Sequence, residues 1–382
     1  MYLYKAGWEI WYNSTMHTYH YHQIPTWQLK RYYFLSLIYE KKLVTKPNIL
    51  IVSVIIPVRN RKTITHNILV QLYKQISQLD HQIYKIHTVV VDDNSSDGTS
   101  EMIIDQFPEV HLIQGDGNLW WTGAIVQGMK YAVEKLNTHY ILWLNDDIYL
   151  SENFIEKILE LCSNDQFKDS LYGGLVRDNT YHDWIVYSGF TKKQPAQLMD
   201  NFSESDILEV DALNGNIVII PKEIVEKIGF PDRKRFLHYG GDYEFSYRAK
   251  SFGFKVLLCN QLIAKTDYTI DDLIRYMPPL LQWHLKSNQS CLKRFQILKG
   301  LTNIKTNYNI WHMLNIIYWH KQKIPIYQYW VYYIKAIIKL LVSDFWPTER
   351  IEQEFKNYFQ LKKAPTELAE AVMYRTKLKS GV

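Results

Sequence analysis

Two pairs of adjacent aspartates, each standing behind a short apolar run, constrain the fold of this chain more than any other feature. The run TVVV precedes Asp92 and Asp93, and the run YILWL precedes Asn145 followed by Asp146 and Asp147. Segments with helical periodicity separate these runs, an alternation typical of a parallel sheet flanked by helices. Ligands bind at the carboxyl ends of strands in open α/β sheets, so both pairs are expected at a binding edge.

The central part of the chain accounts for most of the predicted sheet. The predicted strands are Ile49–Pro57, Ile86–Val91, Val110–Ile113 and Tyr140–Leu144, then a mixed part over Tyr172–Val176, Trp184–Phe190 and Val210–Ile220. Helices are predicted near residues 64–79, over 124–136 and within the segment 235–251, and a further helix is predicted to begin near Thr99, which would be its cap. From Asp271 onward the pattern is helical. We expect an α/β domain over residues 49–268, an extension over 1–48 and a helical region over 269–382.

Composition limits the class of protein. Lys and Arg exceed Asp and Glu by 44 − 39 = 5, which suits phosphates or an anionic membrane surface but does not indicate a nucleic-acid partner. The 3 cysteines have no CxxC spacing, so neither a zinc site nor a disulfide framework is predicted, and a cytoplasmic location is expected. The amino terminus does not resemble a secretory signal, and no uncharged apolar stretch reaches 18 residues.

The pair Asp146 and Asp147 is a candidate cation site. Adjacent carboxylates repel each other unless a cation neutralises them, and oxygen ligands favour Mg²⁺ or Mn²⁺. The alternative is a solvated acidic turn. Asp93 stands behind the other strand, where an acidic side chain can accept hydrogen bonds from a nucleobase or ribose.

A glycine-bearing loop over Gly115–Gly123 contains Gly117, Asn118 and Trp121. Its glycines would allow close approach of backbone to a ligand, and the helix that follows offers free N–H groups to phosphate. The alternative is that these glycines serve only a tight turn. Farther along, Asp242 follows two glycines at the start of a predicted helix. It would suit a general base, or it would act as the helix N-cap.

These segments together resemble family 2 glycosyltransferases. The stretches SVIIPVRN from Ser53, VDDNSSDGT from Val91, LNDD from Leu144 and GDYEF from Gly241 follow the order and approximate spacing of that family. The resemblance covers about residues 49–268. The stretch GNLWWTGA from Gly117 is similar to the rhamnosyltransferase-like branch, whose members act in cell-surface polysaccharide synthesis.

The resemblance implies a GT-A fold, an inverting mechanism and a divalent cation. It also implies a nucleotide-sugar donor and a saccharide or lipid-linked acceptor. It places Pro57 and Arg59 against the nucleotide and Asp93 against the base. The motif at Asp146 and Asp147 would bind the donor and the metal.

In this resemblance Asp147 is the direct metal ligand and Asp242 is the catalytic base, with Gly241 in place of a frequent glutamate. One departure concerns a histidine that many relatives carry after the last strand of the domain. Here that stretch reads IAKTDY from Ile263, and Asp267 is a candidate substitute.

Two other functions fit part of the sequence. An inactive nucleotide-sugar-binding homologue would explain the missing histidine, but the retained aspartates argue against it. A nucleotidyltransferase would show glycines in the basic stretch after the first strand, and Val58–Lys62 has none.

The two ends of the chain raise separate hypotheses. Residues 5–13 resemble residues 250–260, because both segments are predicted to be a helix end, a glycine and a strand. Residues 20–39 are predicted to be the helical tail that follows. We therefore interpret residues 1–48 as the remnant of an upstream glycosyltransferase domain. The alternative is a chance match of an aromatic-rich leader. Near the other end, Ile324–Phe345 is predicted to be a helix that either lies peripherally on a membrane or packs on the catalytic domain.

Overall fold

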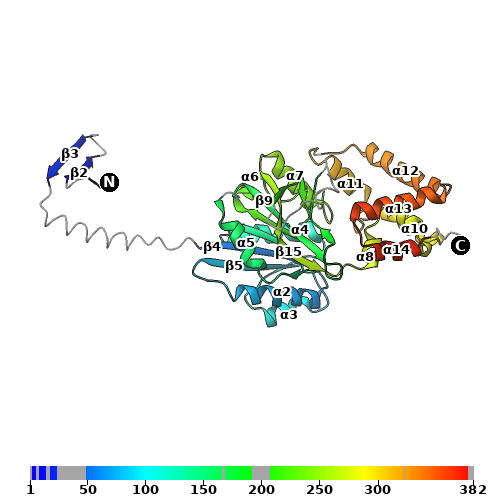
Figure 1. Ribbon diagram of the computed structural model, residues 1–382, viewed down its shortest axis with the longest axis horizontal. Coiled ribbons are helices and arrows are strands. Elements are labelled where there is room, and N and C mark those ends of the chain that lie inside the picture. The colour runs from blue at the N-terminus through cyan, green and yellow to red at the C-terminus, as the bar shows by residue number, and fades with distance from the viewer. Residues whose placement is uncertain are drawn as a thin grey trace. The chain divides into compact units, whose positions relative to one another are not determined.

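The structure is a computed structural model, shown in Figure 1. It describes residues 49–165, 168–191, 207–321 and 323–376, together with three strands among the first 48 residues. The chain divides into two compact units, Met1–Ile49 and Leu50–Val382.

The first unit contains an antiparallel sheet of β1 (Tyr2–Lys5), β2 (Trp8–Asn13) and β3 (Thr18–Gln23). Tyr2–Lys5 is thus a strand where the sequence predicted the end of a helix. The strand predicted after Gly7 occurs as β2, whereas residues 20–23, predicted to begin a helical tail, lie in β3. Residues 24–48 lie outside the described residues.

A mixed sheet forms the centre of the second unit, in the order β12-β15-β9-β14-β7-β4-β5-β6, with β10 beside β9 and β8 beside β15. Its strands are β4 (Leu50–Val58), β5 (Tyr84–Asp92), β6 (His111–Gln114), β7 (Tyr140–Leu144), β8 (Tyr149–Leu150), β9 (Ser170–Asp178), β10 (Ile185–Tyr187), β12 (Ile207–Glu209), β14 (Ile217–Pro221) and β15 (Lys255–Thr266). Strands β7, β4, β5 and β6 are parallel, whereas β14 is antiparallel to both its neighbours. Strands β11 (Gly189–Phe190) and β13 (Ala212–Leu213) pair apart from this sheet.

Helices cover both faces of the sheet (Figure 1). On one face lie α2 (Lys62–Ile76), α3 (Thr99–Gln106) and α5 (Phe154–Ser163), and on the other lie α4 (Trp120–Lys135), α6 (Lys222–Ile228) and α7 (Gly241–Ser251). Strand residues alternate between two apolar cores: Val54 and Ile56 of β4 face the first core and Ile55 the second. This architecture confirms the predicted α/β class.

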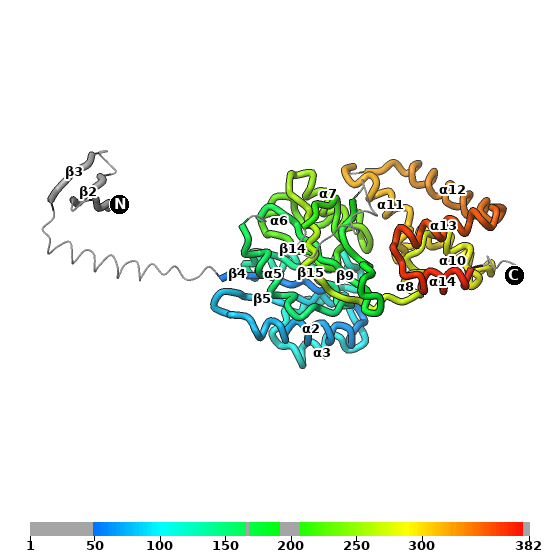
Figure 2. Tube along the Cα trace, viewed as in Figure 1, coloured from blue at the N-terminus to red at the C-terminus, as the bar shows by residue number. Residues whose placement is uncertain are grey.

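The helical carboxyl-terminal region follows the sheet directly, as the trace in Figure 2 shows. Its helices are α8 (Ile270–Arg275), α9 (Pro279–Trp283), the short 3₁₀ helix η3 (Lys286–Asn288), α10 (Cys291–Gly300), α11 (Ile310–Ile317), α12 (Ile326–Ser343), α13 (Thr348–Lys362) and α14 (Thr366–Tyr374). Trp184 of the catalytic part belongs to one of this region's cores and donates a hydrogen bond from Nε1 to the carbonyl of Lys362 at 2.8 Å. Among the described residues, no helix combines the length and apolar character needed to cross a bilayer.

Several element boundaries differ from the sequence-based expectations. The predicted strand Val210–Ile220 is divided into β13 and β14 by a turn, and Trp184–Phe190 is likewise divided into β10 and β11. Helix α3 is preceded by Gly98 in a left-handed conformation, so Thr99 is its first residue and not its cap. Asp97 accepts the Thr99 N–H instead, at 3.1 Å. Helices α5 and α6 were not predicted.

Candidate active site

The parallel strands bring the predicted site residues to one edge of the sheet. Strand β4 lies between β5 and β7 and is parallel to both, so their carboxyl ends are adjacent. Pro57 and Arg59 stand at the end of β4, Asp93 follows β5, and the segment Asn145–Asp147 follows β7. The fold therefore supplies the neighbourhood that the two aspartate pairs predicted.

Asp93 anchors the glycine-bearing loop. Its side chain is 2% exposed and accepts hydrogen bonds from the backbone N–H groups of Gly117 at 2.8 Å and of Leu119 and Trp120 at 3.1 Å. Arg59 Nη1 lies 3.6 Å from Asp93 Oδ2 and also donates to the Gly117 carbonyl. Because these groups occupy the carboxylate, Asp93 positions the loop in this conformation and does not present a free oxygen to a base.

The same loop has two features that depend on this anchor. A Cβ atom added at Gly115 would lie 2.8 Å from Asp93 Oδ1 and 3.0 Å from its Cα, so only glycine fits there. Trp120 has a φ of 55°, a conformation that bulky residues rarely adopt unless their surroundings hold it. Asn118 is exposed at the tip of the loop. The glycines thus serve a close approach of loop to Asp93.

Trp121 links the loop to the second aspartate pair. Its Nε1 donates to Asn145 Oδ1 at 2.9 Å, and the Asn145 amide in turn donates to Asn216 Oδ1. A Cβ atom at Gly215 would lie 2.4 Å from the indole ring, so this position also requires glycine. Sequence reasoning named neither Asn216 nor Gly215, because no motif surrounds them.

Asp242 lies near the start of α7 but does not cap it. The N-cap position belongs to Gly240, with a φ of 86°, so the interpretation of Asp242 as a helix cap is wrong. Its carboxylate accepts the N–H of Gly215 and the N–H of Tyr243, each at 2.9 Å. Asp242 is half-buried, and this burial raises its pKa to about 6. A carboxylate with such a pKa is a better proton acceptor at neutral pH than an ordinary aspartate.

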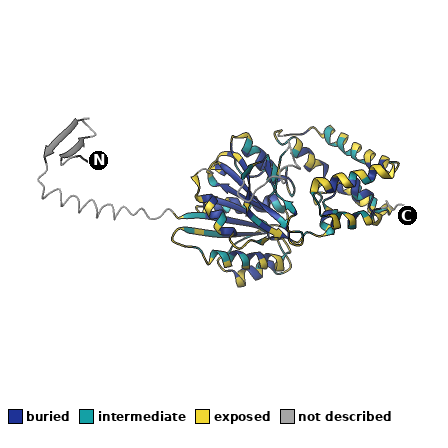
Figure 3. Ribbon diagram, viewed as in Figure 1, coloured by how far each residue is buried: buried dark blue, intermediate teal, exposed yellow. Residues whose placement is uncertain are grey.

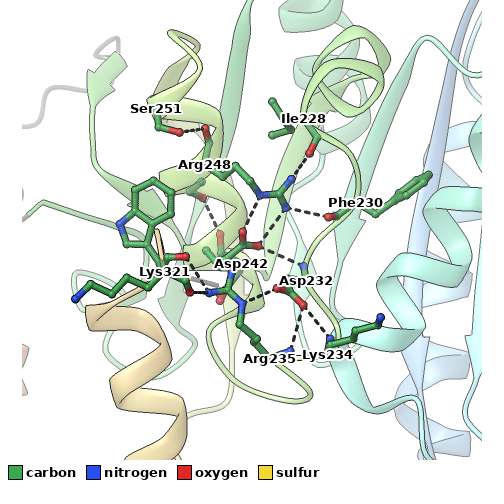
Figure 4. Close-up of polar contacts among 12 residues, drawn as sticks. Ile228, Phe230, Asp232, Lys234, Arg235, Asp242, Arg248, Ser251 and Lys321 are labelled. Atoms are coloured by element: carbon green, nitrogen blue, oxygen red, sulfur yellow. Dashed lines mark hydrogen bonds and ion pairs between the residues drawn. The ribbon is translucent and has the colours of Figure 1, made fainter. Parts of the chain in front are cut away.

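The loop that precedes Asp242 is held on both sides (Figure 4). Arg248 pairs with the buried Glu244, with 2.7 Å between Nε and Oε1, and donates to the carbonyl of Phe230 at 2.9 Å. Arg235 donates to the carbonyls of Trp319 at 2.9 Å and Lys321 at 2.8 Å. The connection between α11 and α12 therefore helps to hold the loop that precedes the candidate base.

Arg61, which sequence reasoning did not single out, bridges Asp146 and Asp147. Its Nε lies 3.2 Å from Asp146 Oδ1 and its Nη2 lies 3.1 Å from Asp147 Oδ2. Asp146 is buried and also accepts from Thr65 Oγ1 at 3.0 Å, whereas Asp147 is 46% exposed at the side chain. Burial raises the pKa of Asp146 to about 6, the Arg61 charge lowers it, and the Asp147 charge adds to the increase.

A cavity of about 500 Å³ opens beside this bridge. Its lining residues are Arg61, Ile64, Asn67, Gln71, Asp146, Asp147, Ile148, Tyr149, Tyr187, Thr266, Asp267, Tyr268, Asp272, Arg275 and Tyr276. Asp267 accepts hydrogen bonds from Tyr149 at 2.7 Å and Asn179 at 3.0 Å. Asp267, the candidate substitute for the missing histidine, thus lines the same cavity as Asp147.

Hydrogen bonds connect the three groups of aspartates. The Thr122 N–H donates to the carbonyl of Leu237 at 3.2 Å, and this joins the loop anchored by Asp93 to the segment that precedes Asp242. The Gly215 N–H donates to Asp242, and the next residue, Asn216, accepts a hydrogen bond from Asn145, which directly precedes Asp146 and Asp147. The 500 Å³ cavity includes Asp146 and Asp147 but neither Asp93 nor Asp242. The candidate site therefore joins the carboxyl edge of the sheet to the start of α7, and its cavity lies beside Asp146 and Asp147.

Residues 53–210 match the model of the family described as glycosyl transferase family 2. The chain is 22% identical over 206 residues to the low-salt glycan biosynthesis hexosyltransferase Agl10 of Haloferax volcanii, a match that covers 52% of this chain and 64% of that protein. It is 27% identical over 144 residues to the 4,4'-diaponeurosporenoate glycosyltransferase of Staphylococcus haemolyticus, which covers 36% of this chain and 34% of that protein. The chain thus spans less than two thirds of the length of either relative.

Two solved structures are also similar to this chain. The mannosyltransferase PcManGT from Pyrobaculum calidifontis in complex with GDP-Man and Mn²⁺ has a TM-score of 0.43 and 14% identity, over 82% of this chain and 94% of that one. GalNAc-T7 with UDP, GalNAc and Mn²⁺ has a TM-score of 0.45 and 16% identity, over 71% of this chain and 57% of that one.

Residues 53–210, the segment that matches glycosyl transferase family 2, belong to the mixed sheet with helices on both faces, and a helical region follows that sheet.

Proposed function

We propose that this chain is an inverting glycosyltransferase of the rhamnosyltransferase-like branch. It would move a hexose or rhamnose from a nucleotide-diphosphate donor to a hydroxyl of a saccharide or lipid-linked acceptor, in the synthesis of a cell-surface polysaccharide. The observation that carries the proposal is Asp242, a half-buried carboxylate with a pKa of about 6 that is connected by hydrogen bonds to the strand-end aspartates. Both curated relatives are glycosyltransferases by name, which supports the same reaction class.

A divalent cation, Mg²⁺ or Mn²⁺, is part of the proposal, and the residues present fit one. Within the described part of the chain, no three His, Cys, Asp or Glu side chains gather closely enough to hold a metal. Magnesium commonly uses one or two carboxylates and completes its shell with substrate phosphates and water. Asp147, exposed beside the cavity, would hold the ion, and Asp146 and Asp267 would support it. When bound, the ion would stabilise negative charge on the leaving diphosphate.

The remaining steps fall to the chain's own residues. Asp242 would accept the proton of the acceptor hydroxyl, whose oxygen forms a bond to the anomeric carbon as the bond to the diphosphate oxygen breaks. Pro57, Arg59 and the loop residues Gly117, Asn118 and Trp121 would hold the donor. Asp93 would act on the donor through that loop, since the backbone N–H groups of the loop already occupy its carboxylate.

Arg61 is expected to compete with the cation for the two aspartates. Arg61→Gln should therefore raise the affinity of the protein for Mn²⁺ alone by roughly fivefold to tenfold, since a partly exposed ion pair contributes about 1 kcal/mol. Calorimetric titration with MnCl₂ measures this affinity in the absence of donor. Arg59→Gln is the matched control, because Arg59 lies beside Asp93. Equal Mn²⁺ affinities for the wild type and Arg61→Gln would contradict the competition.

The proposed function is tested by a screen of UDP-, GDP- and dTDP-sugars. Metal-dependent thermal stabilisation by one donor, followed by sugar transfer to an acceptor hydroxyl with inverted anomeric configuration, would support it. Donor binding with no transfer to any acceptor and no donor hydrolysis would favour the alternative, an inactive nucleotide-sugar-binding homologue. We also propose a cytoplasmic location with peripheral contact to the membrane face.

A further inference from the structure

Helix α12 has two apolar faces, although a helix packed on a domain needs only one. One face contributes to the core of the helical region, where Tyr329, Tyr333 and Leu340 pack with Trp283 and Leu314. The helix is therefore held to the rest of the chain by one side. Among the described residues, the opposite side of the helix carries exposed side chains.

The second face carries large apolar side chains that are exposed. They are Ile326, Tyr327, Trp330, Val331, Ile334, Ile338, Leu341 and Val342, with Phe345 just beyond the helix, and their exposed fractions range from 42% to 88%. At about 100° per residue these positions fall within an arc of about 160° around the helix axis. Exposed residues follow the outer side of α12 in Figure 3. A continuous apolar patch of this kind marks a contact surface.

The charges around this face select a lipid surface with anionic headgroups. The helix contains no acidic residue, and its only charged residues, Lys335 and Lys339, are exposed at one border of the apolar arc. Lys321 and Lys323 are exposed just before the helix. Asp344, which follows it, is neutralised by Arg294 at 2.7 Å. Aromatic and aliphatic side chains on one face with lysines at its border are typical of helices that lie in a membrane interface.

We infer that α12 lies flat on an anionic membrane, with the arc from Ile326 to Phe345 in the interfacial layer and the lysines on lipid phosphates. This surface adjoins the candidate base through α11. Trp311 of α11 contacts Tyr329 of α12, with ring centroids 5.7 Å apart. At the other end of α11, a Cβ atom at Gly240 would lie 2.7 Å from Ile316. Resting on the proposed function, membrane docking would bring a lipid-linked acceptor to the side of the site that carries Asp242.

Flotation of the full chain with lipid vesicles tests this inference without reference to transferase activity. Wild type should float with phosphatidylcholine vesicles that contain 30% phosphatidylglycerol and float less with phosphatidylcholine alone. The triple substitution Trp330→Gln, Ile334→Gln and Ile338→Gln should lower the partition coefficient by about 100-fold. Lys335→Gln with Lys339→Gln should lower it by about 30-fold on anionic vesicles only.

The matched control replaces exposed apolar residues elsewhere, Val70→Gln with Ile104→Gln on α2 and α3, and should float as wild type does. Circular dichroism and thermal unfolding of each variant identify any that do not fold. The lysine pair, which is exposed, provides a second test if the triple variant fails. Wild type that stays with the protein fraction on anionic vesicles would overturn the inference. A wild-type dimer that becomes a monomer in the triple variant, without vesicle binding, would assign this face to a second copy instead.

Discussion

Replacing Asp242 by Asn is expected to lower kcat by about 10²- to 10⁴-fold, the usual contribution of a positioned general base. The amide keeps the shape of the side chain and its acceptor for the Gly215 N–H, but it cannot take the acceptor proton. Donor affinity should stay within a factor of about two, because the proposed role of Asp242 is to accept the proton of the acceptor hydroxyl and not to bind the donor. Steady-state kinetics and donor titration measure the two quantities separately.

The pH profile gives an independent check of the same residue. Burial raises the pKa of Asp242 to about 6, so the base is protonated and inactive below that pH and active above it. The wild-type rate should therefore rise as the pH increases through about 6. Asp105→Asn, an exposed carboxylate on α3, is the matched control and should keep both the rate and the profile. Asp242→Asn with wild-type turnover would remove Asp242 from the mechanism.

The raised pKa also predicts a direction for stability. The folded protein binds a proton at Asp242 more tightly than the unfolded chain, whose aspartates have a lower pKa. The contribution of this group to stability is thus present at low pH and is lost as the pH rises through about 6. Asp242→Asn should remove this pH dependence, because an amide does not titrate there, and thermal unfolding of both proteins below and above pH 6 measures it.

Replacing Asp147 by Ala is expected to abolish the metal-dependent part of donor binding. Asp147 is the exposed carboxylate of the pair, whereas Asp146 is buried and bonded to Thr65 and Arg61. Loss of a residue that supports a metal ligand lowers metal affinity by about 10- to 100-fold, and loss of a direct ligand should lower it more. We therefore expect the donor affinity measured with Mn²⁺ to fall by at least about 100-fold. Donor titration calorimetry with and without Mn²⁺ measures it.

Two comparisons make this prediction specific. If Asp267 only supports the site, Asp267→Asn should lower metal-dependent donor affinity less than Asp147→Ala does. If Asp267 is a direct ligand, the two losses of affinity should be equal. Asp116→Ala changes an exposed carboxylate of the glycine-bearing loop and should leave the effect of Mn²⁺ intact. Donor affinity that responds to Mn²⁺ equally in Asp147→Ala and wild type would show that the ion is held elsewhere.

The elements that the sequence predicted best are those with an unbroken local pattern. The strand Tyr140–Leu144 occurs with the predicted boundaries, because a run of five apolar residues between polar ones has the length of a buried strand and is short for a helix. The segment Val210–Ile220 is long and interrupted by small polar residues, and the sequence predicted one strand there without the turn around Gly215. That turn matters, because its N–H binds Asp242.

The residues that the sequence left unassigned act through distant partners. Arg61 stands in a basic stretch that looks like an ordinary helix start, and its role comes from the end of β7, more than 80 positions later. Four tyrosines line the cavity. Tyr149 lies on β8, Tyr187 on β10, Tyr268 just after β15 and Tyr276 just after α8. No local pattern can indicate such contacts, since only the packing of these elements brings them together.

The sequence by itself determined the class of sheet, the edge at which the aspartates stand, and the segments that carry them. Hydrophobic periodicity and strand-end polarity suffice for these, because both are properties of neighbouring residues. Tertiary structure decided the state of each carboxylate. Asp93 is occupied by backbone N–H groups, Asp147 is exposed beside a cavity, and Asp242 has a raised pKa. These states depend on burial and on hydrogen-bond partners contributed by other segments, which only the folded chain brings into contact.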